Sequence, residues 1–170
     1  MSRSRISILI IGVVLISHVA ATPQVMGQSE LTGEPVCTGR YKGTRKPSHT
    51  ELTDILKKHA DWLKDGRASR SELANDPRRA NLCEADLTGA YLAMADLRRA
   101  DLRDSNLEAT HLDGTHLDGA HMPGADLAGA HLAGAFVRNA LLDGAHLNSA
   151  HMPGADLKGA DLTGASLAGC

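Results

Sequence analysis

A five-residue repeat occupies the second half of the chain and limits what the chain can fold into. Residues 80–169 consist of eighteen consecutive five-residue units without an insertion. The central residue is Leu in fifteen units, the residue two positions earlier is always Ala, Ser or Thr, and eleven units end in Gly. A period of five matches neither the 3.6-residue period of a helix nor the two-residue period of a strand. Each unit therefore predicts a short extended segment followed by a corner, with the central and the small residue pointing inward.

The repeated pattern, Ala-(Asp or Asn)-Leu-x-Gly, resembles that of the pentapeptide-repeat family. The resemblance covers 90 of the 170 residues. It implies a mainly β fold, a right-handed quadrilateral β-helix, in which four units form one square coil and residue n stacks on residue n+20. Eighteen units then give a solenoid of about four and a half coils over residues 80–170. Successive coils would pair in parallel about 4.8 Å apart and would bury a continuous core.

With this register, apolar columns fill the interior of the solenoid. One column consists of Leu87, Leu107, Leu127, Leu147 and Leu167, and the other three are apolar from end to end. Catalysis needs a concave site that excludes water, and a square rod with a leucine interior offers none. The sequence also lacks the GxSxG, HExxH, P-loop and GxGxxG motifs. We therefore predict no enzymatic activity and no cofactor.

The N-terminus has the pattern of an export signal. Arg3 and Arg5 precede a mostly apolar run over residues 6–21, and small residues follow it. We expect cleavage after Ala21, with Gly27 as a second option, so residues 1–21 are the predicted signal peptide. The run is shorter than the roughly 20 residues that a membrane span needs, and an uncleaved anchor is the alternative. The predicted location is periplasmic or secreted, with membrane contact only if this segment stays attached.

Residues 28–79 do not repeat, and they predict a leader and a capping helix. Ser48 and Glu51 form a capping-box pattern before a helix expected over about residues 49–65, and Gly66 ends it. The apolar residues on one helical face are Leu52, Ile55, Leu56, Trp62 and Leu63. An open end of a β-helix exposes apolar core and unpaired backbone, so it needs a cap. We predict that the helix places Trp62 and Leu63 over the first coil; a partner-binding helix is the alternative.

Three cysteines are present, and an exported protein permits disulfides. Cys83 follows a central Leu in the first unit and should face outward, and Cys37 lies in the leader to the helix. We predict a Cys37–Cys83 bridge. Cys170 takes a small inward position and is expected to be a buried filler, with an intermolecular disulfide as the alternative. The cysteine spacing does not match that of a zinc site.

Six histidines lie directly before a central residue of the repeat. With a period of twenty, His111, His131 and His151 form one column above Tyr91. Two stacked imidazoles could bind a metal ion weakly, so these three residues are the candidate metal ligands. The other interpretation is that His replaces Asp or Asn at an outward position that tolerates any polar residue, and on this interpretation the protein has no metal site.

Composition excludes some functions and leaves others open. The whole chain carries a net charge of −2, whereas residues 80–170 hold 5 Lys+Arg and 12 Asp+Glu, a net charge of −7. Aromatic residues make up only 2%, which excludes an aromatic stacking platform for single-stranded nucleic acid. We predict a non-catalytic, exported scaffold that presents flat faces to a protein partner of unknown identity.

Two alternatives and one assembly follow from the same residues and the resemblance. Some pentapeptide-repeat proteins resemble an acidic DNA duplex and inhibit DNA gyrase, so an acidic DNA mimic is the first alternative. The export signal and the histidines at positions where acids would be wanted argue against it, and we expect no nucleic-acid partner. The second alternative is an envelope protein that responds to metal or pH through its stacked histidines. Some family members dimerise through their C-terminal coils, so the resemblance also implies a homodimer through the last coil.

Overall fold

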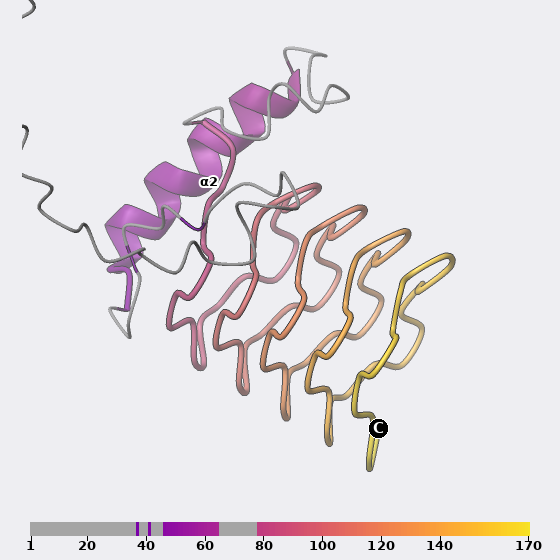
Figure 1. Cartoon of the computed structure of the whole chain (residues 1–170). Coiled ribbons are helices and arrows are strands. Elements are labelled where there is room, and N and C mark those ends of the chain that lie inside the picture. Colours follow the sequence, from indigo (N-terminus) through magenta and orange to yellow (C-terminus); the bar gives the residue numbers. More distant parts are fainter. Residues whose placement is uncertain (1–36, 38–40, 42–45, 65–77) are drawn as a thin grey trace, which may run out of the picture.

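One helix precedes a regularly coiled segment in the computed structural model, which describes residues 37, 41, 46–64 and 78–170 (Figure 1). The helix is α2, His49–Lys64. The predicted signal peptide and both of its cleavage sites lie outside the described residues. Within the described part of the chain, the helix is neither long nor apolar enough to cross a bilayer.

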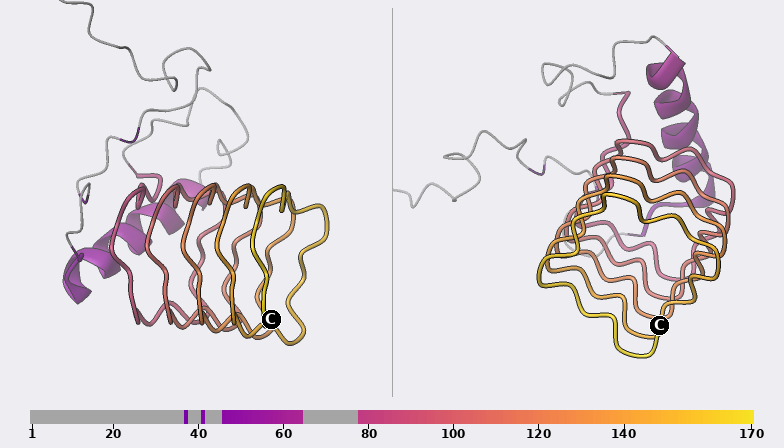
Figure 2. Two further views of the ribbon diagram at one scale, coloured as in Figure 1. Left: turned by 60° about the horizontal axis from the view of Figure 1, so that its bottom comes forward. Right: turned by 90° about the vertical axis from the view of Figure 1, so that its right-hand side faces the viewer.

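The coiled segment pairs each unit with the unit twenty residues later. All fourteen bridges are parallel and join residues n and n+20, beginning with Asn81 and Asp101 and ending with His146 and Ser166. Four five-residue units therefore complete each turn, in the register that the sequence predicts. The views along and across the axis show these turns stacked on one another (Figure 2).

The pairing differs from the predicted short strands. Over residues 78–170 every pairing is an isolated bridge, and none of these residues belongs to a named strand. In each unit a hydrogen-bonded turn follows the central residue, as where the Ala85 N–H donates to the Leu82 carbonyl oxygen at 3.1 Å. The third residue of every such turn has a positive φ, which is the pattern of a type II turn. Because turns take up so much of each unit, no two successive residues can bridge.

The inward columns form the core. Leu87, Leu107, Leu127 and Leu147 are all buried, with at most 2% of their surface exposed. Leu167, in the same column, is 40% exposed, which corrects the prediction that the whole column is core. It lies in the last unit, so it packs only against the coil before it.

Helix α2 covers the first coil, but through a different set of residues from the predicted one. Leu52 joins the apolar cluster of the coils, and Ile55 and Leu56 pack against that cluster. Trp62 is 2% exposed and Leu63 is partly buried, but neither predicted capping residue belongs to the apolar cluster of the coils. Leu63 follows Leu52 by eleven residues, which places it on the same side of the helix, but it lies in the last turn, one residue before the end of α2.

The start of α2 has the capping box that the sequence predicts. The Glu51 N–H donates to Ser48 Oγ at 3.2 Å, and the Ser48 N–H donates to Glu51 Oε2 at 2.9 Å. Both bonds satisfy backbone donors that the helix itself leaves unpaired. The helix ends at Lys64, one residue before the predicted end.

Candidate functional site

His59 joins α2 to the first coil at a fully buried position. Its Nδ1 accepts the Ala80 N–H at 3.1 Å, and its Nε2 lies 2.9 Å from the Arg98 carbonyl oxygen. A nitrogen that accepts carries no proton, so Nε2 must carry the proton and donate it to Arg98. The contacts therefore require a neutral imidazole. Burial lowers the pKa of His59 from 6.5 to about 4, with the cations Arg79 and Arg98 acting in the same direction.

The ring of Trp62 lies against His59 on the same helix. The two ring centroids are 5.3 Å apart and the planes are within 21° of parallel. The indole N–H of Trp62 is buried without a hydrogen-bond partner among the described residues. Trp62 is the only tryptophan in the chain, so its fluorescence reports on this junction alone.

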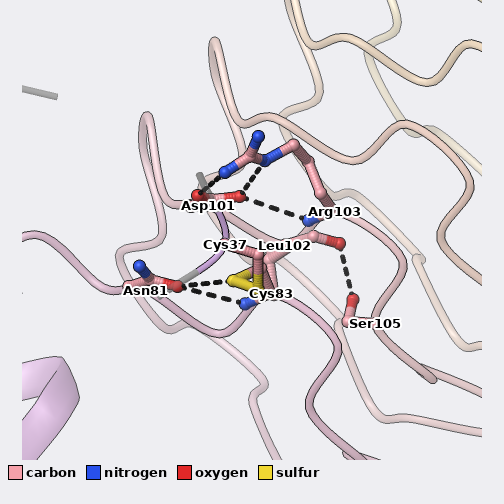
Figure 3. The surroundings of a disulfide bond; sticks show 7 residues. All are labelled: Cys37, Asn81, Cys83, Asp101, Leu102, Arg103 and Ser105. Carbon is pink, nitrogen blue, oxygen red and sulfur yellow. Dashed lines mark hydrogen bonds and ion pairs between the residues drawn. A yellow bond between two sulfur atoms is a disulfide. The ribbon is translucent and has the colours of Figure 1, made fainter. Parts of the chain in front are cut away.

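A disulfide and a buried ion pair lie together at the start of the coils (Figure 3). Cys37 is bonded to Cys83, the pair that the sequence predicts, with Cα atoms 5.9 Å apart and a sequence separation of 46. Arg103 Nε and Nη2 donate to the two carboxylate oxygens of Asp101 at 2.8 and 2.7 Å. The Arg103 and Asp101 side chains are only 10% and 3% exposed. This pair therefore lies in a desolvated setting that the sequence pattern does not reveal.

The predicted histidine column is present, but its rings stack instead of converging. The rings of Tyr91 and His111 are 4.4 Å apart and within 2° of parallel, and those of His111 and His131 are 4.9 Å apart and within 16°. His151 stands edge-on to His131 at 6.3 Å. The lone pair of an imidazole nitrogen lies in the ring plane, so parallel stacked rings cannot direct two nitrogens at one ion. Within the described residues, no three His, Cys, Asp or Glu side chains are grouped to hold a metal.

A neighbouring face carries paired charges. Arg98 binds both carboxylate oxygens of Asp96, and Arg138 Nε donates to Asp156 Oδ2 at 2.6 Å. The pKa of Asp156 is lowered, first by the hydrogen bond from the Lys158 N–H and then by Arg138. The Arg138 guanidinium also lies 5.6 Å from the Phe136 ring centroid. These exposed pairs neutralise one another within the face, and pairs of this kind contribute little to stability.

The last coil has an open depression lined by His151, Met152, Leu157 and Cys170, among others. Cys170 is exposed instead of buried as predicted, and its Sγ lies 2.9 Å from the Leu147 carbonyl oxygen. It is a free thiol in the structure, and the predicted homodimer through this coil stays a prediction.

Comparison with known sequences agrees with this geometry. The sequence profile of the family described as pentapeptide repeats matches residues 78–104, 105–144 and 140–170, with eight copies. The chain belongs to the pentapeptide-repeat family. The matched residues are those of the coiled segment, and α2 lies outside them.

Several solved structures of pentapeptide-repeat proteins are similar to this chain. HetL, described as involved in heterocyst differentiation regulation in the cyanobacterium Nostoc sp. strain PCC 7120, is 41% identical with a TM-score of 0.47. The match covers 48% of this chain and 38% of HetL. A second Nostoc PCC 7120 pentapeptide-repeat protein is 30% identical with a TM-score of 0.38, over 64% of this chain and 74% of that one. One from the Arabidopsis thaliana thylakoid lumen is 33% identical with a TM-score of 0.31, over 50% and 63%. A comparison with curated proteins found no significant match.

The pentapeptide-repeat pattern does not predict the role of His59, which lies in α2 outside the repeats. Its position carries a signal nevertheless, because it lies four residues after Ile55 and three before Trp62, on the apolar face of the helix. A polar residue on such a face needs hydrogen-bond partners when it is buried. The coil supplies both of them through the backbone of Ala80 and Arg98.

Proposed function

We propose that this pentapeptide-repeat protein is a non-catalytic, exported scaffold whose outer faces bind a protein partner. The proposal takes the coils to form a right-handed quadrilateral β-helix of about four and a half turns, as the family implies. Its main support is the interior, where buried leucines fill the columns and leave recognition to the outer side chains. The Cys37–Cys83 disulfide supports export, because disulfides persist in oxidising compartments.

The face with the histidine column is the best candidate for the partner surface. Its four units cover residues 90–94, 110–114, 130–134 and 150–154, and Asp113 is the one charged residue in them. Tyr91 and Met94 are 81% and 74% exposed, the largest exposures among the big apolar side chains of the described residues. Interface centres are poor in charge and rich in Tyr and Met, and this face has that composition.

The partner surface can be tested by site-specific photocrosslinking. A photoreactive residue at Ala93 should give one saturable adduct in the exporting cell, and the change Tyr91→Ala should remove it. The same residue at Ala168, which is also exposed but lies on another face, is the control and should not give that adduct. Equal labelling from both positions would contradict a dedicated face.

Export can be tested by the intact mass of the protein recovered from an exporting bacterial host, with and without reductant. We expect loss of residues 1–21 or 1–27 and a deficit of two protons that reductant restores. A full-length, reduced mass in the cytoplasm would overturn the export proposal. A full-length mass in the membrane fraction would favour the uncleaved anchor.

The acidic coiled segment favours one second candidate, a DNA mimic. Its net charge of −7 would repel nucleic acid and attract a DNA-binding enzyme such as gyrase. A supercoiling assay at low and high salt separates the two candidates, because attraction between exposed charges weakens with ionic strength. We expect no inhibition at either salt concentration, and salt-sensitive inhibition would favour the mimic.

A further inference from the structure

The His59 imidazole makes two hydrogen bonds from the buried face of α2 to two points of the first coil. His59 accepts the N–H of Ala80, where the coils begin, and donates to the carbonyl of Arg98, eighteen residues later. The apolar contacts of Leu52, Ile55 and Leu56 lie on the same side of the helix. Attachment of α2 to the coils therefore depends on which proton state His59 has.

We propose that α2 is an acid-released cap: protonation of His59 detaches the helix from the first coil, while the Cys37–Cys83 disulfide keeps it beside the rod. A doubly protonated imidazole has two donors and no acceptor. Its Nδ1–H would point at the Ala80 N–H, so one bond is lost and two donors face each other. Release lets the ring become solvated and uncovers the leucines at the end of the coils.

The charged groups around His59 act in both directions. From the coils, Arg79 and Arg98 disfavour an imidazolium and Asp96 favours it. Nε and Nη2 of Arg98 donate to the two carboxylate oxygens of Asp96, so this carboxylate already has a cationic partner and does not form a new ion pair with the imidazolium. From α2 itself, the ring of Trp62 covers His59 and excludes water. Protonation is therefore accommodated by release and not by a new ion pair.

The direction of the pH dependence follows from the two states of His59. The docked ring has a pKa of about 4 and the released ring the ordinary 6.5, so the contribution of docking is complete above pH 6.5. It is lost as the pH falls through this window and is gone below about pH 4. Between pH 7 and pH 4.5 the equilibrium constant for release should rise roughly 60-fold.

The disulfide sets how far the released helix can go. Cys37 precedes α2 and is bonded to Cys83 in the first unit of the coils, and the helix lies between these two residues in the chain. The helix is thus attached to the coils on both sides, by the disulfide before it and by the chain leading to Ala80 after it. Return to neutral pH should restore docking without a bimolecular step.

The test uses the full-length, oxidised chain and two signals. Trp62 fluorescence in urea follows the cap, and far-UV circular dichroism follows the coils. We expect the Trp62 midpoint to move to lower urea between pH 7 and pH 4.5, reversibly, while the coils shift less. His59→Gln cannot be protonated and should lose this shift, whereas His49→Gln, an exposed histidine of the same helix, should keep it.

A second measurement keeps the proposal testable if His59→Gln does not dock α2 at all. Nuclear magnetic resonance of the His59 ring in the unmodified chain should show the Nε2–H tautomer at pH 7 and an apparent pKa well below 6.5. A ring that titrates near 6.5 with a mixture of tautomers would overturn the proposal. A full acid shift of the Trp62 midpoint in a folded His59→Gln variant would overturn it as well.

Discussion

At the scale of single residues, the structure repeats one ion-pair geometry in two environments. Arg98 and Arg103 each bind the carboxylate two residues earlier through Nε and Nη2, with distances of 2.6–2.8 Å in both pairs. The Arg98–Asp96 side chains are 48% and 31% exposed, against 10% and 3% for Arg103–Asp101. The two pairs therefore isolate the effect of burial from that of geometry.

Removal of the buried arginine should cost far more than removal of the exposed one. Arg103→Ala leaves the Asp101 carboxylate desolvated, which costs on the order of 3 kcal/mol of unfolding free energy. Arg98→Ala removes a pair of the same shape near solvent and should cost less than about 1 kcal/mol. Urea unfolding of both variants measures the difference, and equal losses would show that burial does not decide the strength of these pairs.

A residue-scale prediction concerns backbone conformation alone. Gly134 has a φ of +64°, and a Cβ built on it would meet nothing within 4 Å. Gly134→Ala should still lower the unfolding free energy by roughly 1–2 kcal/mol, because the left-handed region strains an L-residue. Asn tolerates this region, and Asn139 occupies the same turn position in the next unit with a φ of 52°. Gly134→Asn should therefore cost less in the same urea experiment, and a larger cost would contradict the argument.

Residue patterns predict the backbone register well and the polar partners poorly. The central leucines identify the columns because each must face inward in every turn. The partner of Arg98 is harder to predict, because two outward carboxylates lie near its side chain, Asp96 in its own unit and Asp118 in the next coil. In the structure it binds Asp96. His59 is a similar case, because its partners are backbone atoms, which no sequence pattern marks. The sequence therefore predicts the inside of the coils, the Cys37–Cys83 bond and the capping box, but not the partners of Arg98 and His59.

At the scale of elements, α2 is an amphipathic helix with an ordered first turn. Its apolar side packs on the coils, while an exposed ion pair, Lys58 with Asp54 at 2.7 Å, lies on the polar side. Most helical stability in proteins comes from packing of the apolar face, and the cap at the N-terminus adds to it. The helix boundary was predictable because its capping box is a local pattern.

Loss of the capping box should weaken α2 without unfolding the coils. Ser48→Ala removes the acceptor for the Glu51 N–H and should cost about 1 kcal/mol. Trp62 fluorescence in urea should report this loss, while circular dichroism of the coils changes little. Ser48→Asp keeps a capping oxygen and is the matched control. An unchanged Trp62 midpoint in Ser48→Ala would show that the first turn does not support the cap.

At the scale of the whole molecule, stability comes from contacts between successive coils. Each described turn donates to and accepts from its neighbours along the axis, as where Asp101 donates to Ala80 and accepts from Leu82. Solenoids of this kind depend on nearest-neighbour interfaces, so the ends are their weakest parts. The disulfide and α2 both act at the first coil, where such reinforcement counts most.

Removal of the disulfide should therefore destabilise the cap strongly. With a sequence separation of 46, the chain-entropy relation gives about 4 kcal/mol for the Cys37–Cys83 bond. The double change Cys37→Ala with Cys83→Ala should show this loss in urea unfolding followed by Trp62. Cys170→Ser removes the free thiol only and should unfold like the original chain. A stable double variant would show that the bond does not support the junction.

The constant register has a consequence for insertions and deletions. Loss of one five-residue unit keeps every later central leucine inward, so the packing of the core is preserved. The same loss moves every later outer side chain to the adjacent face, so a column such as Tyr91, His111 and His131 is broken up. Loss of twenty residues removes one whole turn, and every later outer side chain stays on its original face. The length of such a chain can thus vary in steps of twenty residues with its outer columns intact. Steps of five, ten or fifteen residues preserve the fold but separate the side chains that form each outer column.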